Sequence, residues 1–370
     1  MPRFSSPKEF AHGKPPLTAV LMVQLGTPDE PTASALRRYL AQFLSDPRVV
    51  EIPSIVWQPL LHGVILRTRP AKSAAKYASV WLPEGSPLRV YTERQAQGLQ
   101  AALDARGHAV EVAMAMRYGN PSMSSVMRAL RERNLQRLLV LPMYPQYAGA
   151  TTGTVFDEIA RELRSWRNLP ELRLIRNFHD DPAYLEAVAA NIRQAWDEKG
   201  RPDRLVMSFH GVPHRTLMEG DPYHCECHKM ARLLAQRLGL TQDQWMITFQ
   251  SRFGRAAWLE PYTEPTLEAL GRQGVGRVDI VCPGFVADCL ETLEEIAQEA
   301  RDAFLGAGGK EFNYLPCVNH SPAMVETLVG LVERHTGGWD IAKPDSPSEA
   351  AAAGERAAAA KRARDLGALA

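Results

Sequence analysis

Six side chains that can bind metal ions or transfer protons lie within residues 208–229, SFHGVPHRTLMEGDPYHCECHK. They are His210, His214, His224, Cys225, Cys227 and His228. His210 directly follows the apolar run LVMSF, which Gly211 and Pro213 then bring to an end. An imidazole held at a strand end can accept a proton or bind a metal ion near neutral pH. His210 is therefore the first candidate for a catalytic or metal-ligating residue.

The cysteines and histidines that follow it stand at the start of a predicted helix, residues 222–238. A Cys-x-Cys followed by His resembles a fragment of a zinc or iron–sulfur site. Structural zinc sites usually place more residues between paired cysteines and use a second ligand pair, which this sequence does not offer. We interpret His214, His224, His228, Cys225 and Cys227 mainly as surface or loop residues, with a metal-handling role as the alternative.

A row of carboxylates follows another predicted strand, in PGFVADCLETLEEIAQEA, residues 283–300. Asp288, Glu291, Glu295 and Glu299 are spaced by three, four and four residues, which puts them on one face of a helix. Such a row is most often a solvated surface. Because this row begins at a strand end, we expect its first members to point into a cleft. Oxygen ligands in a line suit a divalent cation that must move on.

Hydroxyl, aromatic and basic side chains gather after other predicted strands. The segment LPMYPQYAGATTGTVFDEI supplies Tyr144, Thr151 and Thr152, Arg117 and Tyr118 follow VEVAMAM, and Ser86 precedes a helix. Hydroxyls ahead of a helix N-terminus can bind an anion or a carboxylate. Together these groups suit a flat apolar ligand with acidic side arms, although each aromatic residue alone is as typical of a core.

Short apolar runs alternate with longer amphipathic segments along the chain, which is typical of a parallel sheet covered by helices. The predicted strands are residues 19–25, 110–116, 138–142, 172–175, 205–209, 245–249 and 278–282. The predicted helices are residues 32–45, 92–105, 155–166, 183–198, 222–238 and 290–304.

A faint internal repeat relates the two halves of the chain. LGTP at residues 25–28 corresponds to HGVP at 210–213, and MYPQYAGATTG corresponds to PGFV after a later strand. We therefore predict an α/β protein of two similar doubly wound, Rossmann-like parallel-sheet domains with the active-site cleft between them. The predicted boundaries are a first half at 17–180, a second at 181–319, a C-terminal helix at 320–338 and a low-complexity tail at 339–370.

Composition excludes several classes of function. The chain has 370 residues, 45% apolar and 23% charged, and a formal net charge of +1, so no electrostatic attraction to nucleic acid is expected. Five cysteines, an odd number, indicate reduced thiols and a cytoplasmic location. Residues 53–68, PSIVWQPLLHGVILRT, are too few to span a bilayer, and Pro59 and Gly63 interrupt them.

Six motifs in order across residues 17–335 resemble the ferrochelatase family, which inserts ferrous iron into a porphyrin to make haem. They are MVQLGTPDEP, GSPLRVYTERQ, AMRYGNPS, LPMYPQYAGATTGT, SFHGVPHRTLMEGDPY and PGFVADCLETLEEI. The resemblance implies a lyase that makes protohaem from protoporphyrin IX, with His210 and Glu291 on opposite sides of the pocket, binding the metal or accepting pyrrole protons. It also implies that Asp288, Glu295 and Glu299 form an acidic line for the metal.

The resemblance further implies that the porphyrin is held by Ser86, Arg117, Tyr118, Tyr144, Thr151 and Thr152. Residues 53–68 would form a lip over it that offers a surface for peripheral membrane contact. Iron is a substrate here, so no cofactor is required, and we expect a monomer. The tail lacks cysteine, which argues against the C-terminal [2Fe–2S] centre of some relatives.

Two positions depart from the pattern of the family. Cys289 stands where many relatives have His, and Leu25 where some have Tyr. The alternatives to a protoporphyrin ferrochelatase are a chelatase for coproporphyrin III, another tetrapyrrole or another metal, and a non-catalytic tetrapyrrole-binding protein.

Overall fold

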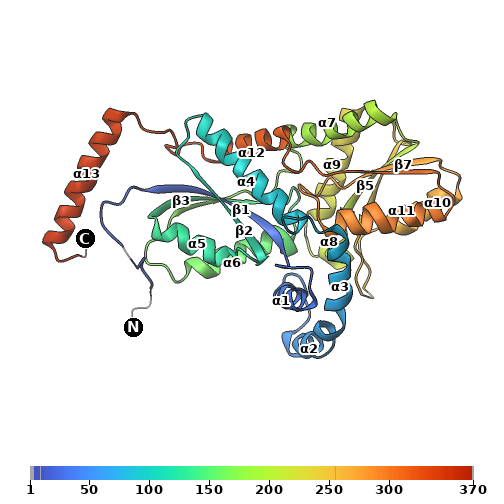
Figure 1. The fold of residues 1–370 in the computed structure, drawn as a ribbon, viewed down its shortest axis with the longest axis horizontal. Helices are drawn as coiled ribbons and strands as arrows, with labels where there is room; N and C mark the ends of the chain where they lie inside the picture. The colour runs from blue at the N-terminus through green and yellow to red at the C-terminus, as the bar shows by residue number, and fades with distance from the viewer. Residues whose placement is uncertain (1–3, 9, 255, 369–370) are drawn as a thin grey trace.

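The computed structural model describes residues 4–8, 10–254 and 256–368, which contain two four-stranded parallel sheets (Figure 1). The strand order is β2-β1-β3-β4 in the first sheet and β6-β5-β7-β8 in the second. The order is the same in both sheets when each is counted from its own first strand, and this confirms the predicted pair of similar doubly wound halves. The strands are β1 Leu17–Thr27, β2 Glu111–Gly119, β3 Leu135–Pro142, β4 Glu171–Leu174, β5 Arg204–His210, β6 Trp245–Gln250, β7 Arg277–Val281 and β8 Glu311–Leu315.

All seven predicted strands are present, and the sequence analysis missed the eighth. The central strands β1 and β5 are buried almost throughout, so their sequences are continuous apolar runs. The missed strand, β8, is an edge strand with the sequence EFNYL, in which Glu311 is exposed. Its polar residues hide the apolar pattern on which the prediction depends.

Helices flank both sheets. In the first half they are α1 Ala33–Leu44, α2 Ser54–Leu60, the π-helix η1 Leu61–Ile65, α3 Leu66–Val80, α4 Pro87–Ala105, α5 Met123–Glu132, the π-helix η2 Gly149–Gly153 and α6 Thr154–Leu163. In the second half and beyond they are α7 Pro182–Lys199, α8 His214–Met218, α9 Tyr223–Leu238, α10 Thr263–Arg272, the π-helix η3 Glu291–Ala300, α11 Arg301–Gly306, α12 Pro322–His335 and α13 Ser346–Asp365. The helix expected at residues 290–304 is thus π-helical over residues 291–300.

One hydrophobic core joins the two halves. It includes Val20 of β1, Leu99 of α4, Val188 of α7, Met207 of β5 and Leu328 of α12, each buried. Figure 1 shows α4, α12 and α7 lying along the same side of the two sheets. This shared core fixes the two sheets relative to each other and therefore fixes the loops at their strand ends.

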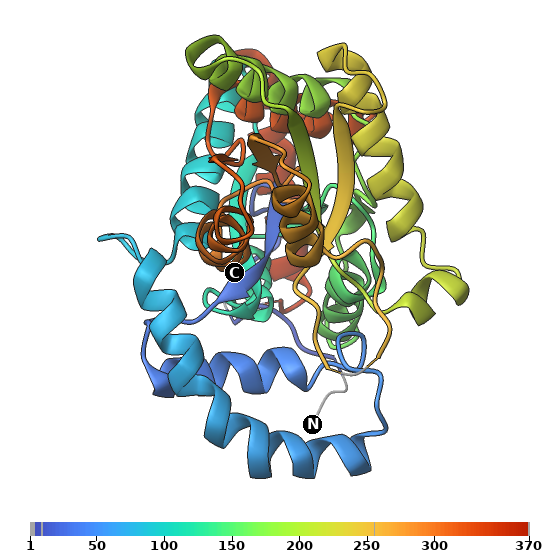
Figure 2. The ribbon, with the colours of Figure 1, turned by 90° about the vertical axis from the view of Figure 1, so that its right-hand side faces the viewer.

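The helices α1, α2 and α3 project from the body of the molecule at one end (Figure 2). The predicted lip, residues 53–68, corresponds to α2, η1 and the start of α3. None of the helices in the described part of the chain has the length and hydropathy that a bilayer span requires. The tail forms the helix α13 at one end of the long axis of the molecule, on the side of the first sheet (Figure 1), where the carbonyl of Arg356 lies close to Gly13.

Candidate active site

A hollow of about 810 Å³, counted with its open mouth, lies where the carboxyl ends of the two sheets face each other. The first half contributes Gln24, Leu25, Gly26, Thr27, Tyr39, Tyr77, Ser86, Leu88, Met143, Tyr144, Gln146 and Thr151. The second half contributes His210, Tyr223, Gly284, Phe285, Val286, Ala287, Cys289, Leu290 and Glu291. Among the residues that the structure describes, no lysine or arginine lines it.

His210 is the last residue of β5, and its ring is fixed in one tautomer. Its Nδ1 lies 2.6 Å from the carbonyl oxygen of Gly211. A carbonyl can only accept, so Nδ1 carries a proton, and in the neutral ring the lone pair is on Nε2. The backbone is held as well, because the Tyr223 hydroxyl donates to the carbonyl of His210 at 2.9 Å. Nε2 is thereby prepared to accept a proton or bind a metal ion.

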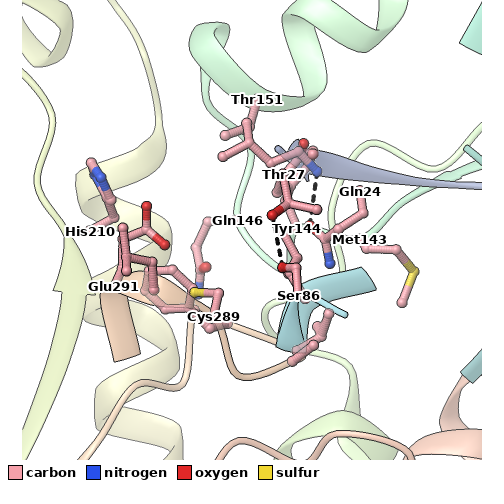
Figure 3. Close-up of a pocket in the computed structure, with 18 of the residues that line it drawn as sticks. Gln24, Thr27, Ser86, Met143, Tyr144, Gln146, Thr151, His210, Cys289 and Glu291 are labelled. Carbon is pink, nitrogen blue, oxygen red and sulfur yellow. Dashed lines mark hydrogen bonds between the residues drawn. The ribbon is translucent and has the colours of Figure 1, made fainter. Parts of the chain in front are cut away.

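Glu291 begins η3, after the loop that follows β7. Since β7 pairs with β5, Glu291 and His210 come from neighbouring strands of one sheet. Figure 3 shows both on the same side of the pocket, away from Ser86 and Thr27. The resemblance to the family implied a pair on opposite sides of the pocket, and the structure differs from that expectation. The motifs do not specify the strand order, so the sequence alone could not show that both residues come from one sheet.

The carboxylates of the acidic row do not all face the same hollow. Glu295 accepts hydrogen bonds from the backbone N–H of Ser251, at 2.6 Å, and from its hydroxyl. Burial raises the pKa of Glu295, partly offset by these hydrogen bonds and by His210. Glu295 and Glu299 line a second hollow beside the pocket that Glu291 lines. In the described residues, no three His, Cys, Asp or Glu side chains are arranged as a ready-made metal site.

Hydroxyl groups from the first half form the facing wall. Thr27 donates to Ser86 at 2.8 Å, and Thr151 also lines the pocket (Figure 3). The Tyr144 hydroxyl is buried without a hydrogen-bond partner in the described structure, and burial raises its pKa, so it stays a neutral donor. Thr152 is likewise buried without a partner for its hydroxyl, but it lies outside the lining.

Arg117 and Tyr118, expected to hold the porphyrin, lie outside the lining and bind other residues of the protein. The Arg117 guanidinium donates to Asp46 at 2.6 Å and to the hydroxyl of Thr154 at 2.6 Å. The Tyr118 hydroxyl donates to the same Asp46 carboxylate at 2.9 Å. Burial opposes ionisation of Asp46, yet hydrogen bonds from Thr154, Arg48 and Tyr118 lower its pKa overall. The network ties the loop after α1 to α6.

Comparison with known proteins identifies the family. The model of the ferrochelatase family matches residues 17–336. A ferrochelatase of Azoarcus sp. is 60% identical over 359 residues, which cover 97% of this chain and 99% of the relative. The chain belongs to the ferrochelatase family. The ferrochelatase of Dechloromonas aromatica is 59% identical, over 92% of this chain and 93% of its own. The predicted resemblance, and with it the prediction of a metal chelatase, a lyase of haem biosynthesis, is confirmed.

Solved structures of low identity share the fold with this member of the ferrochelatase family. SirB from Bacillus subtilis with Fe³⁺ has a TM-score of 0.52 at 11% identity, covering 89% of this chain and 100% of SirB. A multi-domain protein of Deinococcus radiodurans with structural similarity to chelatases has a TM-score of 0.53 at 14% identity, covering 92% of this chain and 60% of its own. At such identities the likeness concerns the fold alone.

The ferrochelatase pocket also contains residues that the sequence analysis did not select. Tyr39 of α1 and Tyr77 of α3 line it, and burial raises the pKa of both phenols, so they stay neutral. Gln24 and Gln146 line it as well. The only signal in the sequence was position, since Gln24 and Gln146 lie near strand ends. Nothing in the helical patterns showed that α1 and α3 cover the pocket.

Asp288, expected in the acidic line, is not part of the lining and serves the loop instead. Its carboxylate accepts hydrogen bonds from Asn319 at 2.7 Å, from the Thr292 hydroxyl at 3.1 Å and from Tyr314. Asp288 is 3% exposed. These bonds fix the loop that carries Cys289 and Glu291 into the ferrochelatase pocket.

The helix α3, whose first residues belong to the lip, reaches η3 of the second half. Lys76 of α3 binds Glu299 at 2.7 Å and Glu294 at 3.0 Å. The guanidinium of Arg69 lies 4.2 Å from the centre of the Phe253 ring. The ion pairs place α3 against η3, which carries the acidic row of this ferrochelatase, and the Arg69 contact places α3 against the loop after β6.

Proposed function

We propose that this ferrochelatase inserts Fe²⁺ into protoporphyrin IX to form protohaem, with His210 and Glu291 as the acting pair. The observation that carries the proposal is the lining itself. A fixed imidazole with a free Nε2 and a carboxylate stand together in a pocket whose other side chains are neutral and largely apolar.

The reaction replaces two pyrrole protons by one Fe²⁺ ion, so it needs a proton acceptor and a group that binds the cation. Nε2 of His210 accepts one pyrrole proton, because Nδ1 already carries its own, and the Glu291 carboxylate accepts the second as the ion passes from its oxygens to the ring nitrogens. The Glu291 carboxylate offers oxygen ligands to the incoming ion while water leaves it. Glu295 and Glu299 extend the oxygen path outward through the second hollow. Iron is the substrate throughout, and the proposal includes no resident cofactor.

The porphyrin ring lies against apolar side chains, among them Leu88, Met143 and Phe285. Its propionates accept hydrogen bonds from the hydroxyls of Ser86 and Thr151. A lining without cations favours protoporphyrin, with two propionates, over coproporphyrin, with four, because each additional carboxylate would lack a basic partner. Arg117 and Tyr118 act from behind the wall by holding the loops in place.

The lip presents apolar side chains to solvent. Ile55 is 85% and Val56 61% exposed on α2, and Leu60 and Val64 continue the patch. Exposed apolar groups gathered on one projecting element are typical of an interaction surface. We assign this patch to peripheral membrane contact, through which an apolar porphyrin reaches a monomeric, cytoplasmic enzyme.

The test is an anaerobic assay of the purified protein with protoporphyrin and Fe²⁺, following loss of the free-porphyrin spectrum. Wild type should metallate the ring, whereas His210→Ala and Glu291→Gln should bind porphyrin and leave it free of metal. His214→Ala, an exposed histidine four residues further on, is the matched control and should retain activity. A wild type that binds porphyrin and never metallates it would establish the carrier alternative. Parallel assays with coproporphyrin test the preference.

A further inference from the structure

Two histidines outside the pocket lie one turn apart at the start of α9. The ring centres of His224 and His228 are 4.3 Å apart, with 45° between the ring planes. Residues four positions apart share one face of a helix, so both rings lie on the same side of α9. His224 is half-buried and His228 is exposed, which leaves the pair open to solvent.

The ring nitrogens of His224 and His228 have no polar partner within the described structure. Neither histidine takes part in a hydrogen bond or ion pair there; the rings contact each other and the buried ring of Phe249. His224 stacks on Phe249 at 6.0 Å with 20° between planes, and His228 lies 6.2 Å from the same ring. Phe249 thus fixes the orientation of both imidazoles while their nitrogens stay available.

We propose that His224 and His228 form a two-histidine site for a divalent transition-metal ion of the Zn²⁺, Co²⁺ or Ni²⁺ class, separate from the iron-insertion pocket. Imidazole nitrogen is a preferred ligand of these ions. With metal–nitrogen bonds of about 2.1 Å, two rings that share one ion have centres roughly 5 Å apart. The observed separation needs only a small rotation of the side chains to reach this geometry, and water completes the coordination.

The electrostatic surroundings favour the unprotonated form that binds metals. Partial burial of the ring lowers the pKa of His224, and the neighbouring His214 lowers it further. Partial burial of the ring also lowers the pKa of His228, and the nearby His224 lowers it further. Both imidazoles are therefore neutral at physiological pH, and metal binding does not have to displace a proton.

The site lies directly behind the pocket wall. Tyr223, the residue before His224, lines the pocket and donates to the backbone carbonyl of His210. An ion that bridges the first turns of α9 is thus next to the element that holds the catalytic histidine, but it is not on the acidic row from Glu299 to Glu291. The inference goes beyond iron insertion and concerns an ion that is not the substrate.

The experiment is a calorimetric titration of the untagged, metal-free full chain with Ni²⁺ at neutral pH. We compare wild type with His224→Gln, His228→Gln and the control His62→Gln, an exposed histidine on the lip. Removing a residue that only hydrogen-bonds a metal ligand already weakens metal binding by about tenfold, and removing a ligand itself should cost at least as much. Either substitution in the pair should therefore weaken one Ni²⁺ equivalent at least about tenfold, whereas His62→Gln should leave it unchanged.

Two further variants separate this site from the proposed active site. His210→Ala should retain the Ni²⁺ equivalent of the pair, and His224→Gln should retain iron insertion and an unchanged thermal midpoint without metal. The proposal is overturned if wild type binds no equivalent sensitive to His224 and His228, or if His210→Ala removes that same equivalent. In that case the two rings only stack on Phe249.

Discussion

The two halves of the molecule have the same strand order but present different chemistry at equivalent strand ends. The first strand of one half ends at Thr27, and the first strand of the other ends at His210. After the third strand comes η2 with Thr151 in one and η3 with Glu291 in the other, and both helices are π-helical at their start. One half therefore contributes neutral hydroxyls to the pocket and the other contributes ionisable groups.

This difference indicates a division of labour between two copies of one scaffold. Parallel strands bring their carboxyl-end loops to one edge, so the fold fixes where the four loops meet. The fold does not fix which side chains these loops carry. The first half also inserts the lip helices between β1 and β2, while the second half places α8 and α9 at the corresponding point. On this account the first half binds the porphyrin and the second half carries out the chemistry.

Apart from His210→Ala, the largest effect is expected from Glu291→Gln, which removes the charge of the second half from the pocket. General acid–base groups typically contribute about 10²–10⁴-fold to a rate, so kcat should fall by about that factor. Steady-state kinetics of iron insertion under anaerobic conditions measure it. A variant with near-wild-type kcat would remove Glu291 from the mechanism.

A large loss of stability is expected from Asp288→Ala, because this carboxylate supports the reactive loop. Its removal leaves the buried groups of Thr292, Tyr314 and Asn319 without their acceptor. Each unsatisfied donor costs about 1–3 kcal/mol, so the free energy of unfolding should fall by several kcal/mol. Thermal or urea unfolding measures it, with Glu299→Ala, a partly exposed member of the same row, as the control. Equal loss in both variants would contradict the assignment.

The buried carboxyl group of Glu295 should make stability depend on pH. Burial raises its pKa in the folded protein above the ordinary value of 4.5. The folded state therefore holds this proton more tightly than the unfolded state, and the resulting stability is present below pH 4.5 and lost as pH rises through the folded pKa. The thermal midpoint of wild type, measured relative to Glu295→Gln, should fall across this range. A pH-independent difference would show that Glu295 has an ordinary pKa.

The smallest effect is expected from Lys76→Met, which breaks the contact between α3 of the first half and η3 of the second. Lys76 is nearly half exposed, and ion pairs of this kind contribute about 0.2–1 kcal/mol. The free energy of unfolding should fall by no more than about 1 kcal/mol, and the difference from wild type should shrink in high salt. A difference that persists in high salt would mean that Lys76 contributes by packing.

Much of the fold could be predicted because its central strands are buried on both faces. Their apolar runs mark β1 and β5, and the similar turns after them reveal the repeat. The edge strand β8 was missed because half-exposed strands carry polar residues. The π-helical geometry of η3 leaves no mark on the spacing of its glutamates, so the sequence indicated only an α-helix.

The candidate site was predictable where a residue ends a strand, lies in the loop after one or stands at the start of a helix. His210, Glu291, Ser86, Tyr144 and Thr151 all line the pocket. Residues beside them are ambiguous, because sequence does not tell on which side of a loop a side chain projects. Asp288, Arg117 and Tyr118 project away and form internal networks. Tyr39 and Tyr77 reach the pocket through the tertiary placement of α1 and α3, which local patterns do not contain.

The most direct test of this division of labour compares His210→Ala with Ser86→Ala, measuring porphyrin binding by fluorescence and iron insertion in the same preparations. We predict that His210→Ala binds protoporphyrin with near-wild-type affinity and forms no haem. Ser86→Ala should raise KM for porphyrin by up to about tenfold, the value of one hydrogen bond, and leave kcat nearly unchanged. If His210→Ala turns over at the wild-type rate, or if Ser86→Ala lowers kcat as deeply, the chemistry is not confined to the second half.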